Sequence, residues 1–111
     1  MSARRAQLDR TLAALADPNR RRVVDLLRRG PMRAGDIAEK AGLSPPAMSR
    51  HLRALRAAGL VEETHPEFDA RVRIYALNPK PIAALRAWLA ETETLWTAQL
   101  ASLKSHIERN E

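Results

Sequence analysis

Apolar residues recur every three or four positions over the first part of the chain, which is the spacing of amphipathic α-helices. The first such run predicts a helix over residues 3 to 16. Asp17 and Pro18 then form a helix start signal, because aspartate can cap free backbone amides and proline suits the first helical position. The second helix is predicted to reach about residue 29. A short extended piece over 31 to 33 and a two-turn helix over 34 to 41 follow.

The stretch GLSPPAMSRHLRALRAAGL, residues 42 to 60, has the pattern of the turn and second helix of a helix-turn-helix. Gly42 can adopt a left-handed conformation, Ser44 can cap a helix, and Pro45 can occupy its first position. Gly59 ends the predicted helix as a left-handed cap. We therefore predict a helix over 45 to 58 that follows a tight turn.

This predicted helix has two distinct faces on a helical wheel. Its apolar stripe consists of Met48, Leu52 and Leu55. A polar and basic face consists of Ser49, Arg50 and Arg53. The stripe is expected to be buried, so the basic face is expected to point away from the core.

Two strand-like runs, over 60 to 65 and 71 to 77, flank a turn over 66 to 70. In the second run Val72, Ile74 and Ala76 alternate with Arg71, Arg73 and Tyr75. A hairpin directly after such a helix is the wing of a winged helix-turn-helix. A long last helix starts near Asn78 and continues for close to 28 residues with many leucines. The fold class predicted is α+β, mostly helical, with about five helices and a two-stranded β-hairpin wing.

The composition and net charge of the chain narrow the class of binding partner. The formal net charge is +6, from 19 Lys and Arg against 13 Asp and Glu, which favours polyanions such as nucleic acid. Four aromatic residues are too few for a platform that stacks single-stranded bases, so duplex DNA is favoured. Without cysteine the chain has no disulfide and no thiolate metal ligand. No stretch resembles an export signal or a membrane span, so we expect a cytoplasmic protein without membrane contact.

The basic face of the predicted helix suits the major groove of DNA, where Arg50 can pair with both acceptors of a guanine. Ser49 can bond a base or a phosphate. The alternative is that these arginines only form a solvated face. His51 lies beside the apolar stripe, where it either reaches a phosphate or bonds a neighbouring helix. The arginines at positions 20 to 22 either clamp phosphates or pair with Asp25 or Asp36.

Three segments together resemble the ArsR/SmtB regulators, from about Leu15 to the end: LADPNRRRVVDLLRRG, GDIAEKAGLSPPAMSRHLRALRAAGLV and RIYALNP. The resemblance implies a homodimeric winged-helix repressor whose first and last helices form the dimer interface. It also implies that Ser49 and Arg50 contact bases, and that the protein represses from a promoter operator, often its own.

The chain departs from the family pattern in three places. Metal-sensing members have a cysteine pair where this chain has residues 33 to 36, and three scattered histidines do not replace a metal site. Pro45 stands where relatives often carry a glutamine that can read adenine, so one base contact is in doubt. The wing contains four carboxylates against Arg71 and Arg73, which disfavours deep insertion into the minor groove.

The last helix resembles that of a subgroup without metal ligands. Trp88 and Trp96 are expected in a dimer core, although they could instead line a pocket for a small-molecule effector of unknown identity. We predict no catalytic residue, metal or cofactor, since no nucleophile and base pair and no phosphate-binding loop is present.

The sequence therefore predicts a sequence-specific transcriptional regulator that binds a palindromic operator in double-stranded DNA as a homodimer. Residues 1 to 111 are expected to form one domain, with dimerisation helices at 1–16 and 79–108, the helix-turn-helix at 34–58 and the wing at 60–77. The alternative is a winged-helix module that binds other proteins. The predicted DNA-contacting residues are Ser44, Pro46, Ala47, Ser49, Arg50, His51, Arg53, Arg71 and Arg73.

Overall fold

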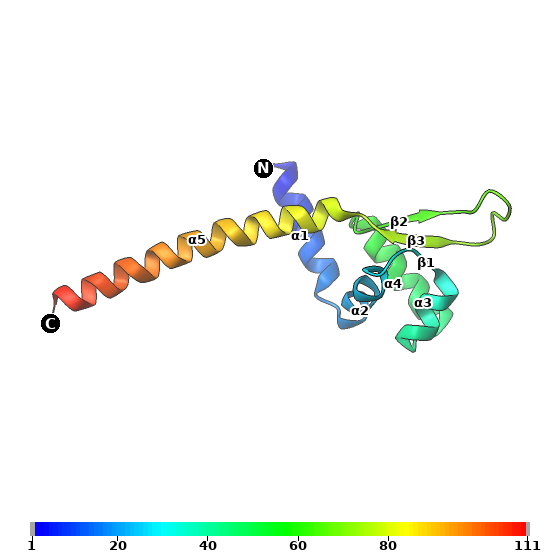
Figure 1. The fold of residues 1–111 in the computed structure, drawn as a ribbon, viewed down its shortest axis with the longest axis horizontal. Helices are drawn as coiled ribbons and strands as arrows, with labels where there is room; N and C mark the ends of the chain where they lie inside the picture. Colours follow the sequence, from blue (N-terminus) through cyan, green and yellow to red (C-terminus); the bar gives the residue numbers. More distant parts are fainter. Residues whose placement is uncertain (1, 111) are drawn as a thin grey trace.

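The computed structural model describes residues 2–110, which form a mostly helical winged helix-turn-helix, as predicted (Figure 1). Along the chain the elements are α1 (Ala3–Leu15), α2 (Pro18–Leu27), β1 (Met32–Arg33), α3 (Ala34–Ala41), α4 (Pro45–Ala57), β2 (Val61–Thr64), β3 (Ile74–Leu77) and α5 (Pro79–Arg109). Most element ends lie within two residues of the predicted ones. The main difference is the start of β3.

The start of α2 follows the predicted signal. The Asp17 carboxylate accepts hydrogen bonds from the amides of Asn19 at 2.8 Å and Arg20 at 3.2 Å. Desolvation raises the pKa of the Asp17 carboxyl, but these hydrogen bonds and the charges of His51 and Arg20 lower it more, so its pKa lies below the ordinary value. The ionised carboxylate is therefore the form that caps α2.

Replacing Asp17 with alanine is expected to lower the midpoint of thermal unfolding by several degrees, because two amides of α2 lose their partner. A carboxyl whose pKa is depressed by folding stabilises the native state above its unfolded pKa. That stabilisation is lost as the pH falls through the native pKa, below about pH 3.9. Circular dichroism melting curves at about pH 7 and about pH 2.5 measure the difference. Asp9→Ala, on the exposed face of α1, is the control, and equal shifts in both variants would contradict the capping role.

The turn between α3 and α4 also follows the local signals. Gly42 has φ of 68°, a left-handed conformation in which its amide donates to the Glu39 carbonyl at 3.2 Å. The Leu43 amide donates to the Ala38 carbonyl at 3.0 Å, which completes the end of α3. The Ser44 hydroxyl accepts from the Ala47 amide at 3.3 Å and caps α4. These bonds fix the angle between the two helices.

The core lies where α2, α3 and α4 meet the sheet. Its largest fully buried apolar side chains are Val23, Ile37, Met48, Leu52, Leu55 and Leu60. Three of the six come from one stripe of α4, so this helix is anchored along most of its length.

The sheet is antiparallel in the order β1-β3-β2. The predicted second wing strand over 71 to 77 is too long, because β3 starts only at Ile74. Asp69 accepts a hydrogen bond from the Arg71 amide at 2.9 Å, which keeps the preceding residues in a turn. The alternation predicts Tyr75 on the same face as Arg71 and Arg73, but Tyr75 is 2% exposed and belongs to the core. Burial of this aromatic ring therefore departs from the alternation that the sequence pattern predicts for the strand.

The last helix extends away from the rest of the molecule, which is 72 Å long (Figure 1). The first half of α5 lies beside α1, where Arg4 and Glu91 form an ion pair at 3.3 Å. Within residues 2–110 no helix has both the length and the apolar composition that a membrane crossing requires. The second half of α5 leaves its large apolar side chains more than half exposed: Leu95, Trp96, Leu100, Leu103 and Ile107.

Candidate nucleic-acid interface

The two faces of α4 are separated as predicted. Met48, Leu52 and Leu55 are at most 1% exposed, so the apolar stripe holds the helix against the core. Arg50 and Arg53 are exposed and Ser49 is half-buried. A duplex can therefore approach the basic face without any rearrangement of the core.

The first turn of α4 offers apolar surface and one hydroxyl. Ser44 and Pro46 are exposed, and Ala47 is half-buried. The Ser44 hydroxyl accepts from the Ala47 amide, but its own proton remains available to a phosphate. Pro46 and Ala47 provide no side-chain hydrogen bond, so their predicted contribution is limited to apolar contact, for which a thymine methyl is the natural partner.

His51 lies half-buried near the start of α2. Its charge is close enough to Asp17 to lower the pKa of that carboxyl. Among residues 2–110 its ring makes no hydrogen bond, so the predicted alternative of a bond to a neighbouring helix is not observed. The phosphate contact of His51 stays a prediction.

The arginines at the start of α2 have a role that the sequence did not reveal. Arg20 Nε donates to the Ala14 carbonyl at 2.7 Å, and Arg21 Nη1 donates to the Leu15 carbonyl at 2.7 Å. Both side chains thus satisfy carbonyls at the C-terminus of α1. A phosphate contact of these arginines stays a prediction.

The predicted ion pairs of these arginines are also not found in the described part of the chain. Asp25 pairs instead with Arg28 at 3.3 Å, within α2. Arg22 donates to the Lys40 carbonyl at 3.3 Å, and this bond joins α2 to the end of α3. The basic run at positions 20 to 22 therefore connects helices.

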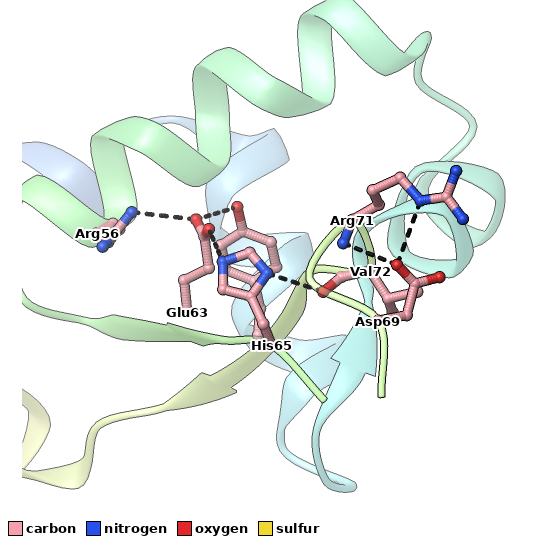
Figure 2. A network of polar contacts seen from close by, with 7 residues as sticks. Arg56, Glu63, His65, Asp69, Arg71 and Val72 are labelled. Atoms are coloured by element: carbon pink, nitrogen blue, oxygen red, sulfur yellow. Dashed lines mark hydrogen bonds and ion pairs between the residues drawn. The ribbon is translucent and has the colours of Figure 1, made fainter. Parts of the chain in front are cut away.

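The wing arginines have different surroundings. Arg71 is almost fully exposed and pairs with Asp69 at 3.3 Å, so part of its charge is compensated (Figure 2). Arg73 is exposed and lines a hollow between the wing and α4 that also includes Ser49 and Arg53. The structure thus brings Arg73 together with the basic face of α4, whereas Arg71 lies further along the wing.

The wing tip is acidic and apolar. Glu67 and Phe68 are exposed, Phe68 at 83%, and Asp69 is half-buried and paired with Arg71. A carboxylate near a phosphate is repelled, so the tip is poorly suited to enter a minor groove. That the wing does not insert deeply into the minor groove stays a prediction.

A polar network at the base of the wing was not predicted. The Glu63 carboxylate accepts hydrogen bonds from the Tyr75 hydroxyl at 2.7 Å and from Arg56 at 3.1 Å, and His65 lies beside it (Figure 2). The bond from Tyr75 contributes most to lowering the pKa of Glu63, against desolvation, while burial and the same bond raise the pKa of Tyr75. The signal in the sequence was cross-strand pairing, because Glu63 faces Tyr75 once the hairpin register is known.

Within residues 2–110 no group of three or more His, Asp or Glu side chains is arranged to hold a metal ion. A hollow between α1 and α5 is lined by Trp88 together with Arg4, Leu8 and Glu91, but Trp96 does not take part in it. The two tryptophans therefore do not share one pocket in a single protomer.

Several proteins similar to this chain are described as transcriptional regulators. A family model described as bacterial regulatory protein, arsR family, matches residues 17–63. The HTH-type transcriptional regulator Rv2034 of Mycobacterium tuberculosis is 38% identical over 100 residues, which are 90% of this chain and 88% of that protein. The transcriptional repressor SdpR of Bacillus subtilis is 41% identical over 56 residues, 50% of this chain and 62% of that protein.

Solved structures agree with these relatives. A crystal structure of an ArsR family transcriptional regulator superimposes with a TM-score of 0.76 at 34% identity, covering 87% of this chain and 97% of that one. Mb0332 of Mycobacterium bovis, a possible ArsR-family regulator, was solved in solution as a homodimeric winged helix-turn-helix DNA-binding domain. It has a TM-score of 0.64 at 27% identity, covering 86% of this chain and 91% of that one.

Proposed function

This chain belongs to the ArsR family of DNA-binding transcriptional regulators, and we propose that it is a homodimeric repressor of its own or neighbouring genes. Family membership confirms the predicted resemblance and makes the protein a regulator with a winged helix-turn-helix, not an enzyme. The operator, the dimer and the direction of regulation are the proposed parts.

One observation carries the proposal. The stripe of α4 is fully buried while Arg50 and Arg53 remain exposed on one outward face. A helix of this kind fits the major groove, where base edges present distinct donors and acceptors. We assign Arg50 to a guanine, a pairing that discriminates against the wrong base by about 1–3 kcal/mol. Ser49 and Arg53 contact bases or the adjacent phosphates.

The proposed dimer uses the terminal helices, residues 1–16 and 79–108. The uncovered apolar side chains of α5 need a partner, and the Mycobacterium bovis relative is homodimeric. Two-fold symmetry then calls for a palindromic operator with half-site centres about 34 Å apart, one turn of DNA. In this arrangement the helix-turn-helix at 34–58 reads the major groove and the wing at 60–77 flanks it.

We propose that the protein represses by occupying promoter DNA. A dimer bound over a promoter keeps the transcription machinery from the same DNA, and the Bacillus subtilis relative is named a transcriptional repressor. We expect the protein to act in the cytoplasm, where a bacterial genome lies. An effector that releases the operator would be a small molecule that binds outside α4.

Selecting bound fragments from genomic DNA identifies the operator and tests the roles of two arginines. Arg50→Ala is expected to lower the preference for operator over random DNA by about ten- to a hundredfold, because it removes a base contact. Arg73→Ala is expected to weaken both DNAs by similar factors, because a phosphate contact carries no sequence information. Titrations with labelled operator and random duplexes measure both ratios.

Arg109→Ala serves as the control, because it removes the same charge at the far end of α5 (Figure 1). It should leave both affinities nearly unchanged. If Arg50→Ala and Arg73→Ala lower the two affinities in the same proportion, the assigned roles are wrong. If the selection yields no preferred sequence, the protein-binding module becomes the better interpretation.

A further inference from the structure

Glu63 lies where three elements meet at the base of the wing. One carboxylate oxygen accepts from the Tyr75 hydroxyl of β3 at 2.7 Å and from Arg56 of α4 at 3.1 Å. The other oxygen lies 3.3 Å from Nε2 of His65 (Figure 2). The Glu63 side chain is only 14% exposed, so little water replaces these partners. One carboxylate therefore joins the recognition helix to both strands of the wing.

We propose that Glu63 is a positioning residue for operator binding: it holds the wing against α4, and His65 reinforces this hold when its ring is protonated. The proposal rests on the proposed operator binding. It assigns to Glu63 and His65 no contact with DNA.

The effect on DNA contacts follows from the hollow between α4 and the wing. Ser49 and Arg53 line it from α4, and Arg73 lines it from the wing. Glu63 and Tyr75 line the same hollow and join its two sides. We call the contacts of Glu63 with Tyr75, Arg56 and His65 the joint. The joint sets the spacing between the base-reading face of α4 and Arg73, the proposed phosphate contact of the wing. A DNA-binding surface that is set before binding loses less entropy on binding.

The ring of His65 lies between two acceptors. Nε2 faces Glu63, and Nδ1 lies 3.0 Å from the carbonyl oxygen of Val72, across the wing loop. A neutral imidazole carries one N–H and can donate to only one of them, whereas the protonated ring donates to both. Histidine changes its charge between about pH 5 and pH 8. Both contacts of His65 are thus made only when its ring is protonated.

Charges of both signs surround the ring. They are Glu63 on β2, Arg56 on α4, Arg73 just before β3, and the Asp69 and Arg71 pair of the wing loop, and the neutral titratable hydroxyl of Tyr75 on β3 faces the same carboxylate. Tyr75 stays neutral over this range, because burial and its bond to Glu63 raise its pKa.

Two glutamates on neighbouring positions of β2 provide the decisive comparison. Glu62→Gln and Glu63→Gln remove the same charge from the same strand, but Glu62 is exposed and makes no side-chain hydrogen bond within residues 2–110. Glu62→Gln is expected to strengthen binding to all DNA about twofold, because one repulsive charge is lost. Glu63→Gln is expected to weaken operator binding about tenfold, because the neutral amide loses the ion pairs with Arg56 and protonated His65, although its oxygen can still accept from Tyr75.

Two further variants keep the test sharp. Tyr75→Phe retains the buried ring and removes only the hydroxyl, so it should weaken operator binding in the same direction as Glu63→Gln. His65→Gln should abolish most of a roughly threefold loss of operator affinity that we expect in the wild type between about pH 5.5 and pH 8. The contribution of His51 is measured with His51→Gln. Melting curves by circular dichroism verify that each variant is folded.

Measuring the pH effect in the Glu63→Gln variant distinguishes two roles of His65. His65 either holds the wing through Glu63 or only adds a positive charge near the DNA. If His65 acts only as a cation near DNA, its pH effect persists in Glu63→Gln and is equal on random DNA. The proposal requires that the effect disappears in Glu63→Gln. Persistence of the effect, or tighter binding by Glu63→Gln as by Glu62→Gln, would overturn it.

Hydrogen exchange of the DNA-free protein gives a result that does not depend on the operator. Glu63→Gln should speed the exchange of amides in β2 and β3 several-fold more than Glu62→Gln does. Equal exchange in both variants overturns the positioning role, whatever the DNA result. If the wild type prefers no sequence, the proposed function fails, and the exchange comparison still decides whether Glu63 holds the wing.

Discussion

Raising the salt concentration from about 50 to about 200 mM is expected to weaken operator binding about a thousandfold, with a log–log slope near −5. The reason is the release of cations condensed on DNA when arginines neutralise phosphates. Each protomer exposes four arginines on the proposed DNA face: Arg50, Arg53, Arg71 and Arg73. If three of the four meet phosphates, the dimer neutralises about six, and each contributes about 0.9 to the slope.

Titrations of labelled operator at several salt concentrations measure this slope. Arg73→Ala removes one phosphate contact from each protomer, so the slope should become less steep by about 2. Arg109→Ala removes the same charge far from the winged helix and should leave the slope unchanged. A slope close to zero in the wild type would count against DNA as the partner of α4 and favour a module that binds proteins.

The helix-turn-helix could be predicted because its determinants are local in sequence. Gly42 ends α3, Ser44 caps α4, and the stripe through Met48 and Leu52 has the period of one helix. Each signal acts within four residues of its target, and all of them agree. The separation of α4 into a buried face and a basic face then follows from geometry alone.

The parts that sequence reasoning missed depend on contacts between elements. Arg20 and Arg21 bond backbone carbonyls of α1, and a carbonyl acceptor has no signature in the sequence. Tyr75 is buried because its hydroxyl finds the carboxylate of Glu63 on the next strand. Both groups look like ordinary surface residues until the packing of α2 on α1 and the register of the hairpin are known. The start of β3 was missed for a similar reason, since a side chain of the loop sets it.

The acidic residues of the wing have two separate roles in this structure. Glu63 at the base accepts from Tyr75 and Arg56 and lies beside His65, so its charge is largely compensated inside the protein. Glu67 at the tip is exposed and remains free to repel phosphates. Counting carboxylates along the wing therefore overstates the repulsion near α4. The basic face of α4 and Arg73 can approach DNA while the tip stays outside the groove.

The apolar face of α5 is the basis for a second prediction, on the dimer and its affinity for the operator. Along this helix Leu89, Trp96, Leu100, Leu103 and Ile107 follow one another at intervals of three, four or seven residues, so they share one side. All five are more than half exposed in the single protomer. Patches of this kind on a soluble protein mark an interface, and the interface proposed here is with a second copy.

Replacing Leu100 with glutamate is therefore expected to split the dimer and to weaken operator binding by about 10²- to 10⁴-fold. A dimer binds its second half-site at a high effective concentration, and a monomer loses this advantage although its own α4 is unchanged. Ala98→Glu is the matched control, because Ala98 is also exposed, lies on the opposite side of α5 and acquires the same charge. Sedimentation and operator titrations measure mass and affinity, while melting curves should show the winged helix still folded, since Leu100 is exposed in the protomer. If Leu100→Glu stays dimeric and binds operator as well as Ala98→Glu does, the apolar side of α5 is not the dimer interface, and the palindromic operator loses its structural basis.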